Sequence, residues 1–133
     1  MPNTFRIAPA ARLLGVSDDT VRRWIDQGLL PTTGATPTEI PGEALAARAV
    51  ALADEPDDPT GASSSARNRL VGIVTRVRID GVMAQVDLQC GPHRVVSLMS
   101  AEAAEELGLQ PGALAVASVK ATVVTVETPR ERI

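Results

Sequence analysis

The sequence has few of the residues on which several classes of function depend. Only Phe5 and Trp24 are aromatic, which excludes base stacking on an aromatic platform as a main function. Cys90, the single cysteine, permits no internal disulfide or thiolate metal cluster, and we expect a small buried strand residue there. The single histidine, His93, is more typical of a turn or strand residue than of a metal ligand. No stretch approaches the roughly 20 apolar residues of a membrane span, so we expect a cytoplasmic protein without membrane partners.

Charge is distributed unevenly along the chain. Residues 1–53 carry as many basic as acidic side chains, residues 54–62 carry four carboxylates and no basic residue, and the remainder is slightly basic. No region has the strongly basic balance of non-specific nucleic-acid binders, so any DNA contact must be local and helped by dimerisation. We predict a helical domain in residues 1–53, a linker in 54–63 and a β domain in 64–133.

Residues 5–30 predict two short helices joined by a tight turn. Gly15 suits the position just after a helix, where a positive φ is common, so the first helix should end there. Ser17 can cap the second helix, whose first turn places Asp18 and Asp19 at the positive end of the helix dipole. The residues of this helix that should pack inward are Val21, Trp24 and Ile25. Two helices with a short glycine turn are the helix-turn-helix pattern.

Two adjacent segments carry a family resemblance: Leu-Leu-Gly-Val at 13–16 and Ser-Asp-Asp-Thr-Val-Arg-Arg-Trp at 17–24. They resemble the MerR and excisionase class of winged helix-turn-helix proteins, over about residues 5–50. The resemblance implies that the contacts to double-stranded DNA come from Ser17, Thr20, Arg22 and Arg23. The wing of that class is usually basic, whereas residues 32–40 hold no basic residue with which to contact phosphate. A module of this shape used only for packing or partner contacts is the alternative.

Further along, a third helix is predicted from Pro41 to about Ala53. Its positions available to the core are Leu45, Ala49, Val50 and Leu52. Residues 54–64 combine acidic residues with Pro, Gly and Ser and show no apolar periodicity, which indicates a flexible linker and a domain boundary.

From Leu70 onward, apolar residues recur at every second position, as they do in strands. This pattern predicts strands at 70–79 and 82–90 joined by an Asp80-Gly81 turn, and further strands near 94–98, 113–120 and 122–127. Ser100 should cap one short helix, Ala101–Leu107. The predicted fold class is α+β, with a small all-helical (winged) helix-turn-helix domain followed by a five-stranded OB-like β-barrel with one short helix.

Four ordered motifs lie in the β half, although on residues alone the serines are more typical of a linker and Arg67 of a solvated charge. The motifs are Ser65-Ala66-Arg67-Asn68, Leu70-x-Gly72-x-Val74, Ser100 with Glu-Glu-Leu-Gly-Leu-x-Pro-Gly at 105–112, and Val119-Lys120-Ala121-Thr122. Together they resemble the Mop, or TOBE, domain of molbindins and molybdate-responsive regulators. The resemblance implies bound molybdate or tungstate, held between subunits by Ser65, Ala66, Arg67, Ser100, Lys120 and Ala121.

These residue types suit a tetrahedral dianion. Molybdate and tungstate present four acceptor oxygens and no donor at neutral pH, so their site needs fixed N–H and O–H donors. The donors would be the backbone N–H groups at the start of the Ser100 helix and the side chains of Ser65, Ser100, Arg67 and Lys120. Ala121 and Ala103 stand where relatives have hydroxyls, and each missing donor would weaken binding by about 1 kcal/mol.

The sequence therefore predicts a cytoplasmic transcriptional regulator that binds double-stranded DNA and senses molybdate or tungstate. Sharing the ligand between subunits requires a homodimer or higher assembly through the Mop domain. The ligand would alter DNA affinity by favouring one assembly or orientation over another. Two alternatives stay open: an oxyanion-binding or storage protein whose helical domain mediates protein contacts, and a regulator whose Mop domain serves only for oligomerisation. With one histidine, no phosphate-cradling glycine loop and no metal-ligand spacing, neither an enzyme nor a metal site is expected.

Overall fold

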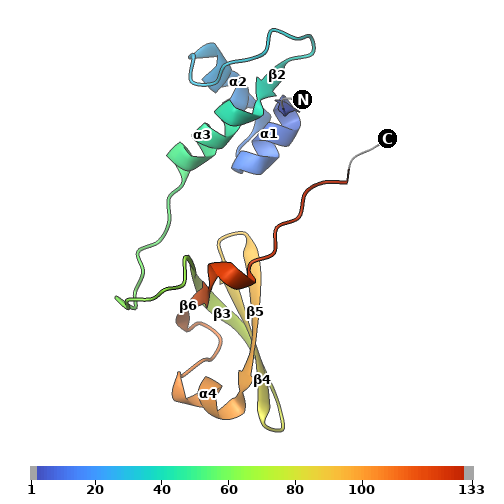
Figure 1. Cartoon of the computed structure of the whole chain (residues 1–133). Coiled ribbons are helices and arrows are strands. Elements are labelled where there is room, and N and C mark those ends of the chain that lie inside the picture. Colours follow the sequence, from blue (N-terminus) through green and yellow to red (C-terminus); the bar gives the residue numbers. More distant parts are fainter. Residues whose placement is uncertain (1–2, 131–133) are drawn as a thin grey trace. The chain divides into compact units, whose positions relative to one another are not determined.

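The structure, a computed structural model, describes residues 3–130. The chain divides into two compact units, with the division between Asp54 and Glu55. In chain order the elements are β1 (Thr4–Arg6), α1 (Ile7–Leu14), α2 (Asp18–Asp26), β2 (Glu39–Pro41), α3 (Gly42–Leu52), β3 (Asn68–Asp80), β4 (Met83–Cys90), β5 (His93–Ser100), α4 (Ala101–Glu106), β6 (Leu114–Val119) and the 3-10 helix η1 (Ala121–Val123) (Figure 1). Within the described part of the chain, no helix has the length and apolarity needed to cross a membrane.

The helical unit contains the predicted helix-turn-helix. The residue after α1 is Gly15, whose φ of 67° lies in the left-handed region that favours glycine. The Thr20 backbone N–H donates to Ser17 Oγ at 3.1 Å, so Ser17 caps α2 as expected. Val21 and Trp24 are buried in the core of this unit, with Ile25 partly buried beside them. The two cap residues and the inward face of α2 are therefore confirmed.

Two other features of this unit differ from the expectation. β1 and β2 pair antiparallel, which the sequence pattern did not indicate, and their pairing joins residues 4–6 to the segment before α3. α3 has nearly the expected bounds, but Leu45 is its one residue in the core. Ala49, Val50 and Leu52 are exposed, so their assignment to the core was wrong. The core formed around α1, α2 and β2 is small, and the last turns of α3 extend beyond it.

The second unit is a four-stranded antiparallel sheet in the order β5-β4-β3-β6. The sheet is curled, and α4 lies at one end of it (Figure 1). A register shift between Val74 and Arg76 inserts a bulge into β3, which bends the strand and increases its twist. The concave side is filled by small and branched apolar residues, among them Val74, Val86 and Leu88. The α+β fold class, with helices preceding a curled antiparallel sheet, is confirmed.

The fifth strand expected at 122–127 is not formed. β6 ends at Val119, and Ala121–Val123 turn into η1 instead. The segment after η1 has no strand assignment, and Val124 and Val126 are exposed. Alternating β-branched residues favour an extended backbone, but a strand also needs a partner edge. Because η1 ends the pairing with β3, the sheet of this chain stays open in the described residues instead of closing into a barrel.

Candidate functional site

One end of the sheet gathers five of the six residues predicted to bind an oxyanion. β3 and β6 pair antiparallel with Asn68 opposite Val119, so the segment before β3 and the segment after β6 meet at the same end. The Asn68 Nδ2 group donates to the Val119 carbonyl at 3.2 Å and fixes this junction. The residues brought together are Ser65, Ala66, Arg67, Lys120 and Ala121, and Figure 1 shows η1 beside the start of β3.

This end offers two cations and several hydrogen-bond donors. Arg67, Lys120 and Ser65 are exposed, whereas Ala66 is buried and its N–H donates to Ser64 Oγ at 3.1 Å. η1 begins directly after Lys120, and the first N–H groups of a helical turn have no acceptor within that turn. The backbone N–H groups of residues 121 and 122 can therefore point at a ligand.

Thr122 is a further candidate at this end of the sheet. It lies in the first turn of η1, one residue after Ala121, and is exposed. Its hydroxyl can supply the side-chain donor that Ala121 lacks. The signal was present in the motif Val119-Lys120-Ala121-Thr122, in which Thr122 carries the hydroxyl.

Ser100 lies at the opposite end of the sheet. It pairs with Met83, which pairs with Asp80 at the end of β3. β3 has 13 residues, so at roughly 3.3 Å per residue about 40 Å of strand separates Ser100 from the Arg67 and Lys120 end. A single chain therefore does not bring Ser100 to the other five residues.

The start of α4 is also more occupied than expected. Ser100 caps this helix, because its Oγ accepts from the Ala103 N–H at 3.0 Å, yet its hydroxyl proton can still be donated. The Ala101 N–H donates to the Val82 carbonyl at 2.7 Å and is unavailable to a ligand. We expected the backbone N–H groups at this helix start to be available to a ligand, but those of Ala101 and Ala103 already have acceptors within the chain. Glu102 also adds a carboxylate to the same turn.

A set of polar contacts beside the Arg67 and Lys120 end fixes part of the predicted linker to the sheet. The Arg69 guanidinium donates through Nε to Asp58 Oδ2 at 2.7 Å, through Nη1 to Ser118 Oγ at 2.7 Å and through Nη2 to Thr60 Oγ1 at 2.8 Å. Asp58 Oδ1 also accepts from the N–H and O–H groups of Thr60. We call Asp58, Thr60, Arg69 and Ser118 the linker clasp. Residues 58–60 are thus anchored, which corrects the prediction that the whole linker is flexible.

The hydrogen bond from Arg69 holds the pKa of the Asp58 carboxyl well below its usual range, and the two hydrogen bonds from Thr60 lower it further. Asp58 therefore stays ionised throughout the physiological range of pH, and its ion pair with Arg69 is kept at this edge of the sheet.

Asp87 is a second ionised carboxylate, and it has a structural role. It is 5% exposed and accepts from Arg94 Nε at 3.0 Å and Nη2 at 2.7 Å, and from Gln85 Nε2 at 3.1 Å. The hydrogen bonds from Arg94 and then Gln85 lower its pKa. A buried carboxylate satisfied on both oxygens is neither a proton donor nor a ligand site, so we assign it to holding β4 against β5.

The predicted DNA-contacting residues cluster on the first two turns of α2. Ser17 Oγ and Thr20 Oγ1 lie 2.9 Å apart and bond to each other, so both hydroxyls are engaged at the cap. Arg22 and Arg23 are exposed, and Arg22 pairs with Asp19 at 3.1 Å. An exposed ion pair of this kind is weak, which leaves the Arg22 side chain able to reorient toward phosphate or a base edge.

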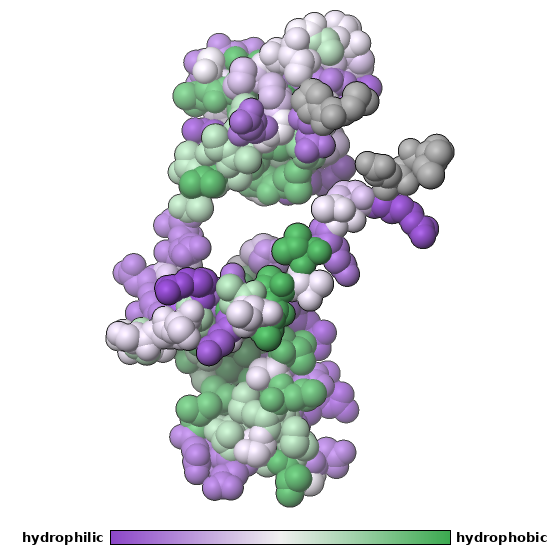
Figure 2. Space-filling view, viewed as in Figure 1, coloured by the Kyte–Doolittle hydropathy of each residue, from purple (hydrophilic) through white to green (hydrophobic). Residues whose placement is uncertain are grey.

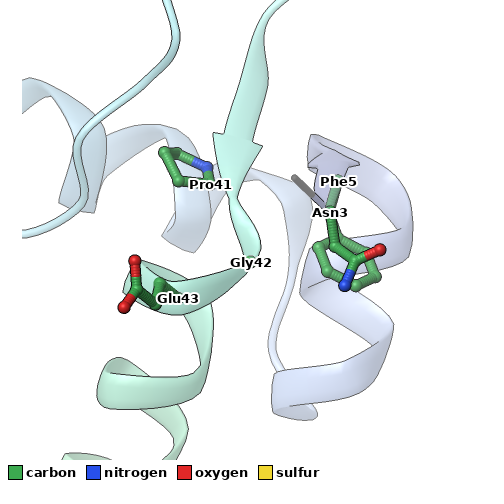
Figure 3. Close-up of a pocket in the computed structure, with 5 residues that line it drawn as sticks. All are labelled: Asn3, Phe5, Pro41, Gly42 and Glu43. Atoms are coloured by element: carbon green, nitrogen blue, oxygen red, sulfur yellow. The ribbon is translucent and has the colours of Figure 1, made fainter. Parts of the chain in front are cut away.

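Each unit also has a cavity among its described residues. One, of about 450 Å³, is lined by Asn3, Phe5, Pro41, Gly42 and Glu43, and Figure 3 shows Asn3 and Phe5 on one side of Gly42 and the Glu43 carboxylate on the other. Among the described residues that line it, the only charge is negative, which does not suit an anion. The other is a groove of about 480 Å³ between the edge strands β5 and β6, lined mostly by apolar side chains. In residues 3–130 no group of three or more His, Cys, Asp or Glu side chains could hold a metal ion.

Comparison with known proteins identifies both units. The model of the TOBE domain matches residues 64–126, and that of the MerR family regulatory protein matches residues 6–38. The molybdenum-pterin-binding protein 2 of Clostridium pasteurianum is 40% identical over 65 residues, which are 48% of this chain and 96% of that protein. The chain therefore belongs to the TOBE-domain family, and its first unit is of the MerR helix-turn-helix type. Both resemblances are confirmed.

Three solved structures are also similar. MopII of Clostridium pasteurianum has 39% identity and a TM-score of 0.46 over 50% of this chain and all of its own. A molybdate-binding protein of Sporomusa ovata has 28% identity and a TM-score of 0.49 over the same shares. The cytoplasmic molybdate-binding protein ModG, with molybdate bound, has 34% identity and a TM-score of 0.45 over 62% of this chain and 68% of its own. Because all three TM-scores are below 0.5, family membership rests on the sequence matches.

Proposed function

We propose that this chain is a cytoplasmic transcriptional regulator that binds molybdate or tungstate at the Arg67 and Lys120 end of its sheet and double-stranded DNA through α2. The observation that supports the ligand assignment is the pairing of Asn68 with Val119. It brings two exposed cations and the η1 donors to one end of the sheet. A tetrahedral dianion needs donors and positive charge, and both are present there. The names of the relatives, which describe binding of molybdate or molybdenum-pterin, agree with this chemistry.

Calorimetric titration with sodium molybdate, sodium tungstate and sodium sulfate tests the ligand. We expect saturable heat with molybdate and tungstate and weaker binding of sulfate, whose smaller radius leaves the donors farther from its oxygens. The absence of heat with the first two anions at millimolar concentration would refute the oxyanion assignment and leave a regulator that uses the β unit only for assembly.

Self-association forms part of the proposal, because Ser100 can join the other five residues only from a second chain. Two features indicate how two copies associate. One is the open groove between β5 and β6, and the other is the segment 124–128, which has no strand partner. Figure 2 shows hydrophobic side chains gathered on the surface of the β unit. Its exposed apolar residues include Val96, Leu98, Leu107 and Leu114. An extended β-branched segment laid against a free edge of another copy would cover this surface and pair that edge.

Truncation after Val123 should therefore disrupt the assembly. The truncated chain keeps η1 but lacks Val124 and Val126, which are 45% and 83% exposed in the full chain. We expect the full chain to sediment as a dimer or larger species and the truncated chain to shift toward monomer. A matched full-length variant, Val124→Thr with Val126→Thr, keeps the β-branched shape while reducing apolar burial, and should weaken association less than truncation does. Identical sedimentation of all three proteins would contradict this mode of association.

DNA binding is tested with fragments of the upstream region of the gene that encodes this chain. Arg22→Ala and Arg23→Ala should each weaken binding in a polarisation assay, and each should reduce the slope of log affinity against log salt by about 1 if its contact is to phosphate. Arg12→Ala, which removes an exposed arginine of α1, is the control for net charge. Molybdate should change the affinity of the unmodified chain.

A second candidate function is favoured by the acidic residues of α2. Asp18 and Asp19 occupy the same turn as the predicted contact residues and reduce its positive charge. If the chain titrates with molybdate but shows no DNA affinity, and Arg22→Ala changes nothing, the protein is an oxyanion-binding or storage protein whose helical unit contacts other proteins.

A further inference from the structure

Asp58 brings a negative charge from the linker to the edge of the proposed oxyanion site. Arg67 lies two residues before Arg69, and Lys120 lies two residues after Ser118, so the backbone of each cation is at most about 7 Å along the chain from a residue of the linker clasp. Arg69 and Ser118 are directly opposite each other in the β3–β6 pairing. Arg67 directly precedes the first residue of β3 and Lys120 directly follows the last residue of β6, so the clasp and the two cations lie at the same end of the sheet.

Because of this proximity, the Asp58 carboxylate and a bound dianion would repel each other and compete for the hydrogen-bond donors of Arg69. This separation is within the Debye length at physiological salt, about 8 Å, so salt weakens the repulsion between the Asp58 carboxylate and a doubly negative ligand but does not abolish it. Arg69 is also the kind of group that a tetrahedral oxyanion attracts, because its planar fork can donate two parallel hydrogen bonds. In the structure these donors are occupied by Asp58, Thr60 and Ser118.

We propose, on the basis of the function proposed above, that Asp58 is an internal anion that opposes ligand binding, so that an oxyanion at Arg67 and Lys120 releases residues 58–60 from the sheet. Binding equilibria of this kind are reciprocal. If the ligand weakens the clasp, then weakening the clasp must strengthen ligand binding by the same factor.

The release would change the reach of the connection between the two units. With the clasp closed, residues 54–57 are the free tether, and four residues span at most about 14 Å. With it open, the tether extends to Ser64, and these eleven residues span up to about 40 Å. In an assembly joined through the β units, ligand binding would thus widen the range of separations open to the DNA-binding helices, which gives the oxyanion a physical route to the DNA.

The experiment compares Asp58→Asn with Asp57→Asn in the full chain. Both variants remove one carboxylate from adjacent positions, but only Asp58 bonds to Arg69. We expect sodium molybdate to bind Asp58→Asn about 5-fold or more tighter than the unmodified chain by calorimetry, with a much smaller gain for Asp57→Asn. Thr60→Val, which weakens the clasp without changing charge, should also tighten binding.

Hydrogen exchange of a peptide covering residues 55–63 gives a readout that does not depend on affinity. The Thr60 amide donates to Asp58 in the closed clasp, so molybdate should accelerate its exchange in the unmodified chain. Equal molybdate affinity in all variants, together with unchanged exchange, would overturn the inference and leave the proposed function intact. No molybdate binding by any of these proteins would overturn the proposed function itself, and the inference with it.

Discussion

Replacing either Arg67 or Lys120 by alanine should remove most of the molybdate affinity of the chain. Hydrogen bonds to charged groups are each worth about 1.5–3 kcal/mol, which corresponds to roughly 10- to 150-fold in affinity. These two side chains are exposed cations at the junction of β3 and β6, and the loss of either removes a positive charge that faces a dianion held there. The double variant should show no measurable heat in a calorimetric titration.

Matched variants separate a specific contact from a general effect of charge. Arg78→Ala removes an exposed cation from β3, the strand that follows Arg67, but near the Asp80 end, and should leave the affinity close to that of the unmodified chain. Arg67→Lys keeps the charge but loses the planar fork, so we expect an intermediate affinity. If Arg78→Ala weakens binding as much as Arg67→Ala does, the anion is attracted by the net charge of the unit and the proposed site is wrong.

The sequence predicted those parts of the fold that depend on local chemistry. Gly15 and Ser17 mark the turn between α1 and α2 because a left-handed residue and a capping hydroxyl have sequence signatures of their own. The strands β3, β4 and β5 followed from period-two alternation. The grouping of Arg67 with Lys120 came only from the family resemblance, and the antiparallel register of β3 and β6 now supplies its physical basis.

The parts that the sequence could not predict depend on contacts between distant residues. The segment at 122–127 has the pattern of a strand, but whether it pairs depends on an available edge, and η1 turns it away from β3. Val50 has the spacing of a core residue, but the core is too small to reach it and it is 78% exposed. The acidic composition around Asp58 indicates a linker, and only the folded position of Arg69 eleven residues later shows that part of it is anchored.

Gly72→Ala should destabilise the β unit by about 2–3 kcal/mol, the upper part of the range for overpacked cores. Gly72 is buried in β3, and a Cβ at this position would lie 2.5 Å from Cys90 Sγ and 2.6 Å from the Gln89 carbonyl oxygen. The side chain of Cys90 could rotate away, but the carbonyl belongs to the backbone of β4, so the strand itself would have to move. Because domains of this size have only about 5–15 kcal/mol of stability, the unfolding midpoint in urea should fall visibly.

A double-mutant cycle with Cys90→Ala tests the cause of this loss. Removing the sulfur relieves one of the two clashes, so Gly72→Ala should cost less in the Cys90→Ala background, but the remaining contact with the Gln89 carbonyl prevents full recovery. Gly42→Ala is the comparison in the helical unit, where the nearest contact is 3.0 Å and a smaller loss is expected. Wild-type stability of Gly72→Ala would show that β3 and β4 can separate at no cost. The close approach of these strands would then not be what holds β3, and with it Arg67, in register with β6.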